Sequence, residues 1–358
     1  METMKSLAVT KDYKLEVVEI PYPKLWDDCV ITKTLSCGVC NGTDSKIAHG
    51  QFKGVDTYPV LLGHEAMGEV VEVGKNVVQW KVGDIVTLPF LEMDPDGTYQ
   101  GTEYRSAWSA YSEYTVARDW KAMLALGKGP GTAAFAGMEY LYTQKILPGD
   151  IDPVYGAMVC VFREVLAASR HFGVTFNQDI VVFGLGSVGM AFVKMAKLLG
   201  ARNVIAVGNK AIQKEVAMSV NADYYINMRE ADAVEAVREI LPEGADIVID
   251  AVGVNELTNT SMSLIKDAGK IGVYGIASQL GMDLSWAKAP YNWILDFFQF
   301  PQKAEEADAH DQIISWIRMG LLDPKDFISH VIPFENILDA FDMIEQKDPK
   351  RKKIVIKY

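Results

Sequence analysis

Short apolar runs and amphipathic helical segments alternate along the second half of the chain. The runs are rich in β-branched residues and too short for helices, which is typical of strands buried in a parallel sheet. Strands are predicted over residues 180–183, 203–207, 224–226, 246–250 and 270–274. Helices are predicted between them, over about 187–199, 211–220, 230–240 and 255–266. This spacing predicts an α/β fold with a doubly wound parallel sheet.

The first part of the chain has a different pattern. Residues 1 to about 90 contain short alternating segments between Pro and Gly residues, which predicts a small barrel-like β module. Residues 91–111 are polar and aromatic without a period, so we expect a long excursion that returns to a strand over 111–116. The final segment, 352–358, is expected to be a strand that pairs with the first module. Further helices are predicted over 156–168 and 308–319.

Two domains are expected in a chain of 358 residues. The β-rich domain would comprise residues 1–155, completed by 300–358, and the α/β domain would comprise 156–299. The one basic run, Lys350 to Lys353, is expected to be a solvated segment before the final strand.

Composition excludes several classes of protein. The net charge of -12 argues against a nucleic-acid-binding role. No apolar stretch reaches the roughly 20 residues that a membrane span needs, and the N-terminal residues lack the apolar core of a signal peptide. Four cysteines do not suggest a disulfide scaffold. A cytoplasmic location with no membrane partner is the resulting expectation.

A glycine-rich turn follows the first predicted strand of the α/β domain. Gly184 would permit a tight turn, Gly186 would let a phosphate approach the backbone, and Gly189 would let the helix lie close to the strand. The free N–H groups at the helix start would then face an anion. A purely structural turn is the alternative. The predicted dinucleotide-binding turn consists of Gly184, Leu185, Gly186, Ser187, Val188 and Gly189.

The end of the next strand bears on which dinucleotide is bound. NAD-binding folds place an acid there, roughly 20 residues after the glycines, on the ribose 2′-hydroxyl. This chain has Gly208, followed by Asn209 and Lys210. A 2′-phosphate would not be repelled, and Lys210 could pair with it, so NADP is favoured over NAD. The missing acid does not forbid NAD, and a solvated Lys210 at a helix start is the alternative.

Cysteine and histidine residues near the first module suggest a metal site. The pair Cys37 and Cys40 has the spacing of half a zinc ribbon, but no second pair follows, so that structural site is rejected. A catalytic zinc ion needs only three protein ligands and keeps one position open. The candidates are Cys40, His64 and Glu65, with Cys160 from the start of the second domain. Taken singly, a polar turn histidine and a buried apolar cysteine would be ordinary structural residues.

Taken in order, these motifs resemble the zinc-dependent medium-chain dehydrogenase/reductase family, which includes alcohol, sorbitol and threonine dehydrogenases. The resemblance covers nearly the whole chain and implies a Rossmann domain and a GroES-like catalytic domain. The motifs are Cys37-Gly-Val-Cys40, Thr43-Asp44, Gly63-His64-Glu65 with Gly68, Val82-Gly83-Asp84, the turn at 184–189, and the segments 246–253 and 269–275.

The resemblance also implies roles for single residues. Cys40, His64 and Cys160 would be zinc ligands, and Glu65 would lie beside the metal, either as a ligand or displaced by water. Asp44 would hold the His64 imidazole in the tautomer that leaves one nitrogen free for zinc. The cofactor would contact the glycine turn, Gly208, Asn209, Lys210 and Val252.

The family's second zinc site is expected to be absent. That structural site uses four closely spaced cysteines, and residues 90–111 contain none. One catalytic zinc ion per subunit and no structural zinc are therefore predicted.

The implied reaction is reversible oxidation of an alcohol, with hydride transfer to the nicotinamide ring. Thr43 would accept the hydroxyl proton, and His49 would relay it or simply lie at the surface. The family usually has one residue between the first ligand and a Ser/Thr-Asp pair, whereas Asn41 and Gly42 both precede Thr43 here. Whether Thr43 reaches the proton-accepting position is therefore left open.

A polyol, cyclitol or sugar alcohol is favoured as substrate over a simple secondary alcohol. A zinc-free quinone or enone reductase of the same fold and a non-catalytic cofactor-binding protein are the rival interpretations. The aromatic segment 284–300 is expected to pack in the core and against another subunit, and the family implies a homodimer or homotetramer. Candidate walls of the substrate pocket are Tyr99, Trp108, Trp286 and Trp293.

Overall fold

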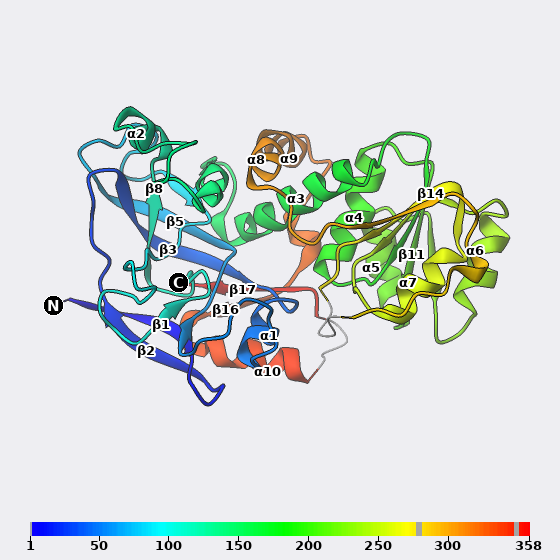
Figure 1. The fold of residues 1–358 in the computed structure, drawn as a ribbon, viewed down its shortest axis with the longest axis horizontal. Coiled ribbons are helices and arrows are strands. Elements are labelled where there is room, and N and C mark those ends of the chain that lie inside the picture. Colours follow the sequence, from blue (N-terminus) through cyan, green and yellow to red (C-terminus); the bar gives the residue numbers. More distant parts are fainter. Residues whose placement is uncertain (1, 277–280, 347–350) are drawn as a thin grey trace. The chain divides into compact units, whose positions relative to one another are not determined.

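The computed structural model describes residues 2–276, 281–346 and 351–358 and divides the chain into two compact units (Figure 1). The first unit comprises Met1–Cys160, Lys303–Ile314 and Ile328–Tyr358, and the second comprises Val161–Gln302 and Ser315–Phe327. Each unit is thus assembled from segments that are distant in sequence. Residues 315–327, expected with the first domain, belong to the second unit, where the Phe327 ring meets that of Phe162 at 4.9 Å.

The first unit contains two β-sheets. The smaller has the strand order β2-β1-β4-β7, and the larger has the order β16-β17-β3-β5-β6-β9, with β8 also pairing with β3. The strands of the smaller sheet are β1 (Thr3–Val9), β2 (Leu15–Pro21), β4 (Val60–Leu61) and β7 (Arg105–Ser106). Those of the larger sheet are β3 (Cys29–Val39), β5 (Ala66–Val73), β6 (Ile85–Thr87), β8 (Tyr114–Arg118), β9 (Ile146–Leu147), β16 (Ile328–Pro333) and β17 (Lys353–Lys357).

The final strand joins the first unit as expected. β17 lies between β16, to which it is parallel, and β3, to which it is antiparallel. Ile354 and Ile356 are buried in the core that this sheet shares with α10 (Ile337–Glu345). Val355, on the other face of the strand, is fully buried against Val154 and Ala157. The other helices that begin in this unit are α1 (Asp44–Ala48), α2 (Trp120–Ala125), α3 (Pro153–His171), α8 (Lys303–Asp308) and α9 (His310–Arg318), with short 3₁₀ turns at Glu139–Thr143 and Phe334–Asn336.

The second unit is built on a parallel sheet with the order β12-β11-β10-β13-β14-β15, which confirms the predicted doubly wound α/β fold (Figure 1). Its strands are β10 (Asp179–Phe183), β11 (Asn203–Gly208), β12 (Tyr224–Asn227), β13 (Ala245–Asp250), β14 (Ile265–Val273) and β15 (Trp293–Phe297). Its helices are α4 (Ser187–Leu198), α5 (Gln213–Ser219), α6 (Ala233–Ile240) and α7 (Asn255–Met262), with 3₁₀ turns at Trp286–Lys288 and Pro324–Phe327. No helix in the described residues is long and apolar enough to cross a membrane.

Two elements differ from the prediction. The helix expected to reach residue 266 ends at Met262, because the chain turns there and β14 already begins at Ile265. The excursion 91–111 contains the short strand β7, which pairs with β4. Tyr99 packs in a small core between this excursion and the strands β1, β2 and β4, and it donates a hydrogen bond to the Pro21 carbonyl at 2.9 Å. Because it is 1% exposed, Tyr99 is wrong as a pocket wall.

Candidate functional site

Three potential metal ligands converge in the first unit. The ligand atoms of Cys40, His64 and Glu65 all lie within 4.8 Å of one another. Cys40 follows the end of β3, and His64 and Glu65 immediately precede β5. The two strands are antiparallel, with Cys37 opposite Ala66, so residues 24 positions apart meet at one end of the sheet. A thiol, an imidazole and a carboxylate are a ligand set that zinc accepts.

Asp44 orients the imidazole of His64. The Asp44 Oδ1 atom lies 3.3 Å from His64 Nδ1, which leaves Nε2 directed toward Glu65 Oε1 at 4.0 Å. Burial alone would lower the pKa of His64. The charge of Asp44 and the contacts with Asp44 and Cys40 outweigh burial, so the pKa stands well above its usual value. Both Nδ1 and Oδ1 are buried and lack a well-aligned hydrogen-bond partner among the described residues. A cation on Nε2 would make Nδ1 a firm donor to this carboxylate, so the residues present fit a metal.

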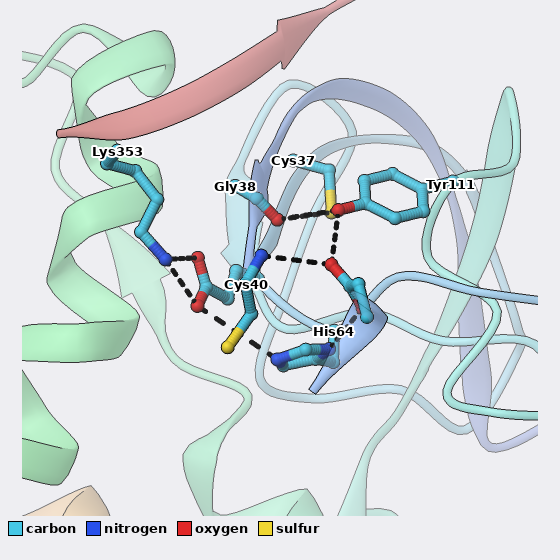
Figure 2. A network of polar contacts seen from close by, with 8 residues as sticks. Cys37, Gly38, Cys40, His64, Tyr111 and Lys353 are labelled. Carbon is cyan, nitrogen blue, oxygen red and sulfur yellow. Dashed lines mark hydrogen bonds and ion pairs between the residues drawn. The ribbon is translucent and has the colours of Figure 1, made fainter. Parts of the chain in front are cut away.

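The other oxygen of Asp44 is held by the protein core. The hydroxyl of Tyr111 lies 2.7 Å from Asp44 Oδ2. It also lies 3.0 Å from the carbonyl of Gly38, toward which Tyr111 points in Figure 2. The backbone N–H of Cys40 also donates to Asp44 Oδ2, at 2.9 Å. Tyr111 is fully buried, and the sequence predicted it only as the first residue of a strand. It was therefore missed, and a single buried tyrosine leaves no sequence signal for this role.

Glu65 is engaged by a buried lysine. The Nζ atom of Lys353 lies 2.8 Å and 2.7 Å from the two carboxylate oxygens of Glu65 (Figure 2). Burial lowers the pKa of Lys353, but the charges of Glu65, Cys40 and Asp44 and the hydrogen bond to Glu65 together raise it by more, so the lysine is held in its charged form. Gly38 makes room for this pair, because a Cβ atom there would stand 2.1 Å from Glu65 Oε2. In this arrangement the Glu65 charge is already compensated without a metal.

Lys353 corrects the interpretation of the basic run. The segment was expected to be solvated, yet the Lys353 side chain is only 2% exposed. Lys350 lies outside the described residues. Residues 353–356 of the last strand are all buried, so both of its faces are covered. Alternation gives no signal for this, because it places Lys353 on the same face as the exposed Lys357.

Cys160 is not a member of the group of three ligands. It is buried on α3, and its charge contributes to raising the pKa of the Cys37 thiol, behind the larger effect of burial. Among the described residues, the group with ligand atoms within 4.8 Å of one another does not include Cys160. Its role as third ligand stays a prediction.

Thr43 and His49 lie at opposite ends of α1. Thr43 is buried. The turn before it is closed by two hydrogen bonds to the Cys40 carbonyl, from the N–H of Thr43 at 3.3 Å and from the N–H of Asp44 at 2.8 Å. This turn accommodates the additional residue after Cys40. The side chain of His49 is half exposed and lies 3.8 Å from Glu345. Their roles in proton transfer remain predictions.

Of the candidate pocket walls, Trp108 lies at the site. Its ring centroid is 5.2 Å from that of His64, and its backbone adopts a φ of 68°, which is uncommon for a bulky residue. Trp286 and Trp293 belong to the second unit.

The glycine turn of the second unit has the geometry that a dinucleotide needs. Gly184 follows β10 with a φ of 86°, and a Cβ atom on Gly189 would lie 1.6 Å from the Gly184 carbonyl oxygen. Ser187 and Val188 open α4, whose first N–H groups are free to bind an anion. Val252 packs against Gly184, and its own N–H donates to the buried Asp250 at 2.9 Å. Gly208 ends β11, and Asn209 and Lys210 follow in the turn before α5.

Comparison with known families matches both units. Residues 27–127 match the alcohol dehydrogenase GroES-like domain, and residues 187–292 match the zinc-binding dehydrogenase domain. Together the two matches span more than half of the chain.

Two dehydrogenases match over three quarters or more of the chain. The sorbitol dehydrogenase of Bacillus subtilis (strain 168) is 24% identical over 99% of this chain and 97% of its own. The alcohol dehydrogenase of Geobacillus stearothermophilus is 29% identical over 75% of this chain and 76% of its own.

Solved structures share the fold. The 2R,3R-butanediol dehydrogenase of Bacillus subtilis superposes with a TM-score of 0.79 at 20% identity, covering 99% of both chains. A short chain alcohol dehydrogenase of E. coli CFT073 holds NADH (TM-score 0.77, 21% identity, 100% of both chains). A protein of Sinorhizobium meliloti 1021 described as a zinc-binding dehydrogenase holds NADP (TM-score 0.76, 24% identity, 100% of both chains). Motifs, fold and matched domains agree, and the chain belongs to the zinc-type medium-chain dehydrogenase/reductase family.

Proposed function

We propose that this protein is a zinc-dependent oxidoreductase that interconverts alcohols and carbonyl compounds with a nicotinamide cofactor. The observation that carries the proposal is the convergence of Cys40, His64 and Glu65 in a chain whose other unit carries a dinucleotide turn. A polyol is the favoured substrate class, supported by relatives that are a sorbitol dehydrogenase and a D-arabinitol dehydrogenase.

Cys40 and His64 would hold the zinc ion, with a third ligand from Glu65 or Cys160. When bound, zinc supplies a Lewis acid that stabilises negative charge on a substrate oxygen. Two observations bear on the third ligand. Glu65 lies within the group but shares both oxygens with Lys353, whereas Cys160 is a thiol close enough to influence Cys37. We favour Cys160, because using Glu65 would weaken its ion pair with Lys353.

The residues around the ligands would position the reacting groups. Asp44 would hold the His64 ring through Nδ1, and Tyr111 would fix Asp44 through its other oxygen. Thr43 would accept the proton of the substrate hydroxyl, and His49, half exposed, would release it to solvent. The face of Trp108 beside His64 would form one wall of the substrate pocket.

The cofactor would bind on the second unit, with its pyrophosphate at Gly186 and the first turn of α4. NADP is proposed over NAD because the last residue of β11 is Gly208 rather than an acid, and because Lys210 follows. One catalytic zinc ion per subunit is proposed, since the excursion 91–111 contains no cysteine. A homodimer or homotetramer is proposed on the family likeness.

Variants of the ligands test the proposal. Cys40→Ser and His64→Ala should abolish oxidation of polyols and simple alcohols while NADP still binds, because the glycine turn lies in the other unit. Metal analysis of Cys160→Ala and Glu65→Gln identifies the third ligand, and we expect the first to lose zinc. Cys37→Ala removes a buried thiol beside the site and serves as the matched control that retains zinc. Near-normal kcat in Cys40→Ser or His64→Ala would rule out the mechanism.

A further inference from the structure

The side chain of Gln213, the first residue of α5, connects two loops of the second unit. Its Oε1 atom accepts hydrogen bonds from the backbone N–H of Asn209 at 3.0 Å and of Lys210 at 3.2 Å. Its Nε2 atom lies 3.5 Å from the carbonyl oxygen of Leu185, in the glycine turn. Gln213 therefore lies between the loop that would bind the pyrophosphate and the loop that would flank the adenosine ribose.

The amide of Gln213 occupies the space that the Cβ atom of an NAD-selecting acid at position 208 would need. A Cβ atom on Gly208 would lie 2.5 Å from Gln213 Oε1 and 3.0 Å from the hydroxyl of Tyr225. An aspartate or glutamate at position 208 is thus incompatible with the present placement of Gln213. The group that faces the predicted ribose site from this strand end is an uncharged amide contributed by the following helix.

The hydrogen bonds of the amide determine which of its atoms faces outward. Two backbone N–H donors require an acceptor, so the oxygen must point to Asn209 and Lys210 and the nitrogen must point the other way. The amide nitrogen carries two hydrogens and has no free lone pair, so it can only donate. Its contact with the Leu185 carbonyl, at 3.5 Å, is long and engages one hydrogen at most.

We propose that Gln213 determines cofactor specificity by donating a hydrogen bond to the 2′-phosphate of NADP. A phosphate is a charged group that only accepts, so it matches a pure donor better than a 2′-hydroxyl does. The assignment rests on the proposed function, because it assumes that the glycine turn binds a dinucleotide. The preference for NADP rested only on the absence of an acid at Gly208 and on the presence of Lys210. The assignment adds the side chain that takes the place of the missing acid.

The variant Gln213→Glu tests the assignment with little change of shape. One carboxylate oxygen can still accept from the N–H groups of Asn209 and Lys210, so the turn keeps its cap. The other oxygen replaces the donor with a charged acceptor, which would bind a 2′-hydroxyl and repel a 2′-phosphate. Gly208→Asp is a less clean test, since its side chain would collide with Gln213.

Tyr225 provides the matched control. Its hydroxyl donates to the carbonyl of Lys210 at 2.7 Å and so holds the same turn from the other side. The variant Tyr225→Phe loosens the turn but leaves the donor on Gln213 in place. It should weaken the binding of both kinds of nucleotide by a similar factor.

The experiment measures dissociation constants of 2′,5′-ADP and 5′-AMP by calorimetry on the full-length protein. We expect the wild type to prefer 2′,5′-ADP and Gln213→Glu to lower that preference by roughly tenfold or more, while Tyr225→Phe leaves the ratio of the two constants unchanged. A ratio in Gln213→Glu within about twofold of the wild-type ratio would overturn the assignment. An equal change of the ratio in Tyr225→Phe would also overturn it.

These outcomes are separate from those that test the proposed function. The two fragments lack the nicotinamide ring and need no metal, so the measurement does not depend on alcohol oxidation. Failure to oxidise any alcohol, with NADP and NAD still bound, would overturn the proposed reaction alone. Binding of both fragments with an unaltered ratio in Gln213→Glu would overturn the role of Gln213 alone.

Discussion

The ion pair between Lys353 and Glu65 places two full charges inside the first unit. Both side chains are less than 10% exposed, and the lysine contacts both carboxylate oxygens. Removing two charges from water is costly, and their attraction compensates only while both partners are present. The carboxylate beside the proposed metal is therefore positioned by a residue 288 positions away in the chain.

Replacing Lys353 with methionine should destabilise the protein strongly. The Glu65 carboxylate would remain buried without its partner, at an expected cost of about 3–5 kcal/mol in the free energy of unfolding. Chemical denaturation of the metal-free protein measures this cost. The control Lys357→Met, at an exposed position of the same strand, should change stability by less than about 0.5 kcal/mol. Adding Glu65→Gln to Lys353→Met should recover part of the loss, and no recovery would contradict the pairing.

The variant Tyr111→Phe isolates the hydroxyl that holds Asp44. We expect it to lower the free energy of unfolding by about 1–3 kcal/mol, because a buried carboxylate loses a hydrogen bond. Zinc affinity should fall by roughly tenfold, as the support of the His64 ring weakens. Competition with a chelator measures zinc retention without turnover.

Tyr358 offers a matched control for this variant. Its hydroxyl is buried beside the same core and has no hydrogen-bond partner among the described residues. Tyr358→Phe should therefore leave zinc retention unchanged. Equal zinc loss in the two variants would mean that Tyr111 acts only by packing.

At the scale of elements, the prediction succeeds where a single pattern determines the structure. The strands β10, β11 and β13 are apolar on both faces and form within one residue of their predicted limits. The predicted position of the boundary between α7 and β14 was wrong, because Ile265 and Lys266 fit either the end of a helix or the start of a strand. Only the pairing of β14 with β13 decides between them.

Asp179 joins the first two strands of the parallel sheet. It accepts hydrogen bonds from Arg202 Nε at 3.0 Å and from Asn203 Nδ2 at 2.8 Å. Burial would raise the pKa of Asp179, but these two residues outweigh it and hold the pKa below its usual value. The carboxylate therefore stabilises the fold above the pKa of an unfolded aspartate, near 4, and this stabilisation is lost as the pH falls through the lower, folded-state value.

Asp179→Asn should consequently destabilise the protein in a pH-dependent way. At pH 7 we expect a loss of about 1–2 kcal/mol, reduced because the side chain of Arg202 is half exposed to solvent. As the pH falls below about 4 the difference between the variant and the wild type should shrink, and it should vanish below the folded-state pKa of Asp179. The control is Asp232→Asn, which should behave like the wild type. Asp232 caps the N-terminus of α6, and aspartate and asparagine serve equally well at that position. A loss in Asp179→Asn that stays constant from pH 3 to pH 7 would contradict the argument.

At the scale of the whole molecule, each unit holds one half of the proposed machinery. The proposed metal ligands Cys40 and His64 lie in the first unit, and the glycine turn lies in the second. Sequence motifs predicted both halves, because each depends on short local spacings. The partners Lys353 and Tyr111 were not predicted, because they reach the site only through strand pairing between distant segments.

Because the proposed metal ligands and the glycine turn lie in different units, the metal and the nucleotide should each slow amide hydrogen exchange in one unit only. Removing the metal with a chelator should speed amide hydrogen exchange in β3 and β17 and leave β10 and β11 unchanged. Adding NADP should slow exchange around residues 184–189 and 208–213 and leave β3 unchanged. Mass spectrometry of the exchanged protein resolves both regions. A uniform response of the two units to either ligand would contradict the assignment.

The long span between Glu65 and Lys353 has a consequence for biosynthesis. While the ribosome is still translating the middle of the message, β3 and β5 can already pair, but β17 has not yet been made. The nascent first unit thus carries a carboxylate without its counter-ion, and the edge of β3 that will pair with β17 is still open. The second unit is encoded entirely between these two residues and is complete sooner, so the proposed nucleotide site can form before the proposed metal site.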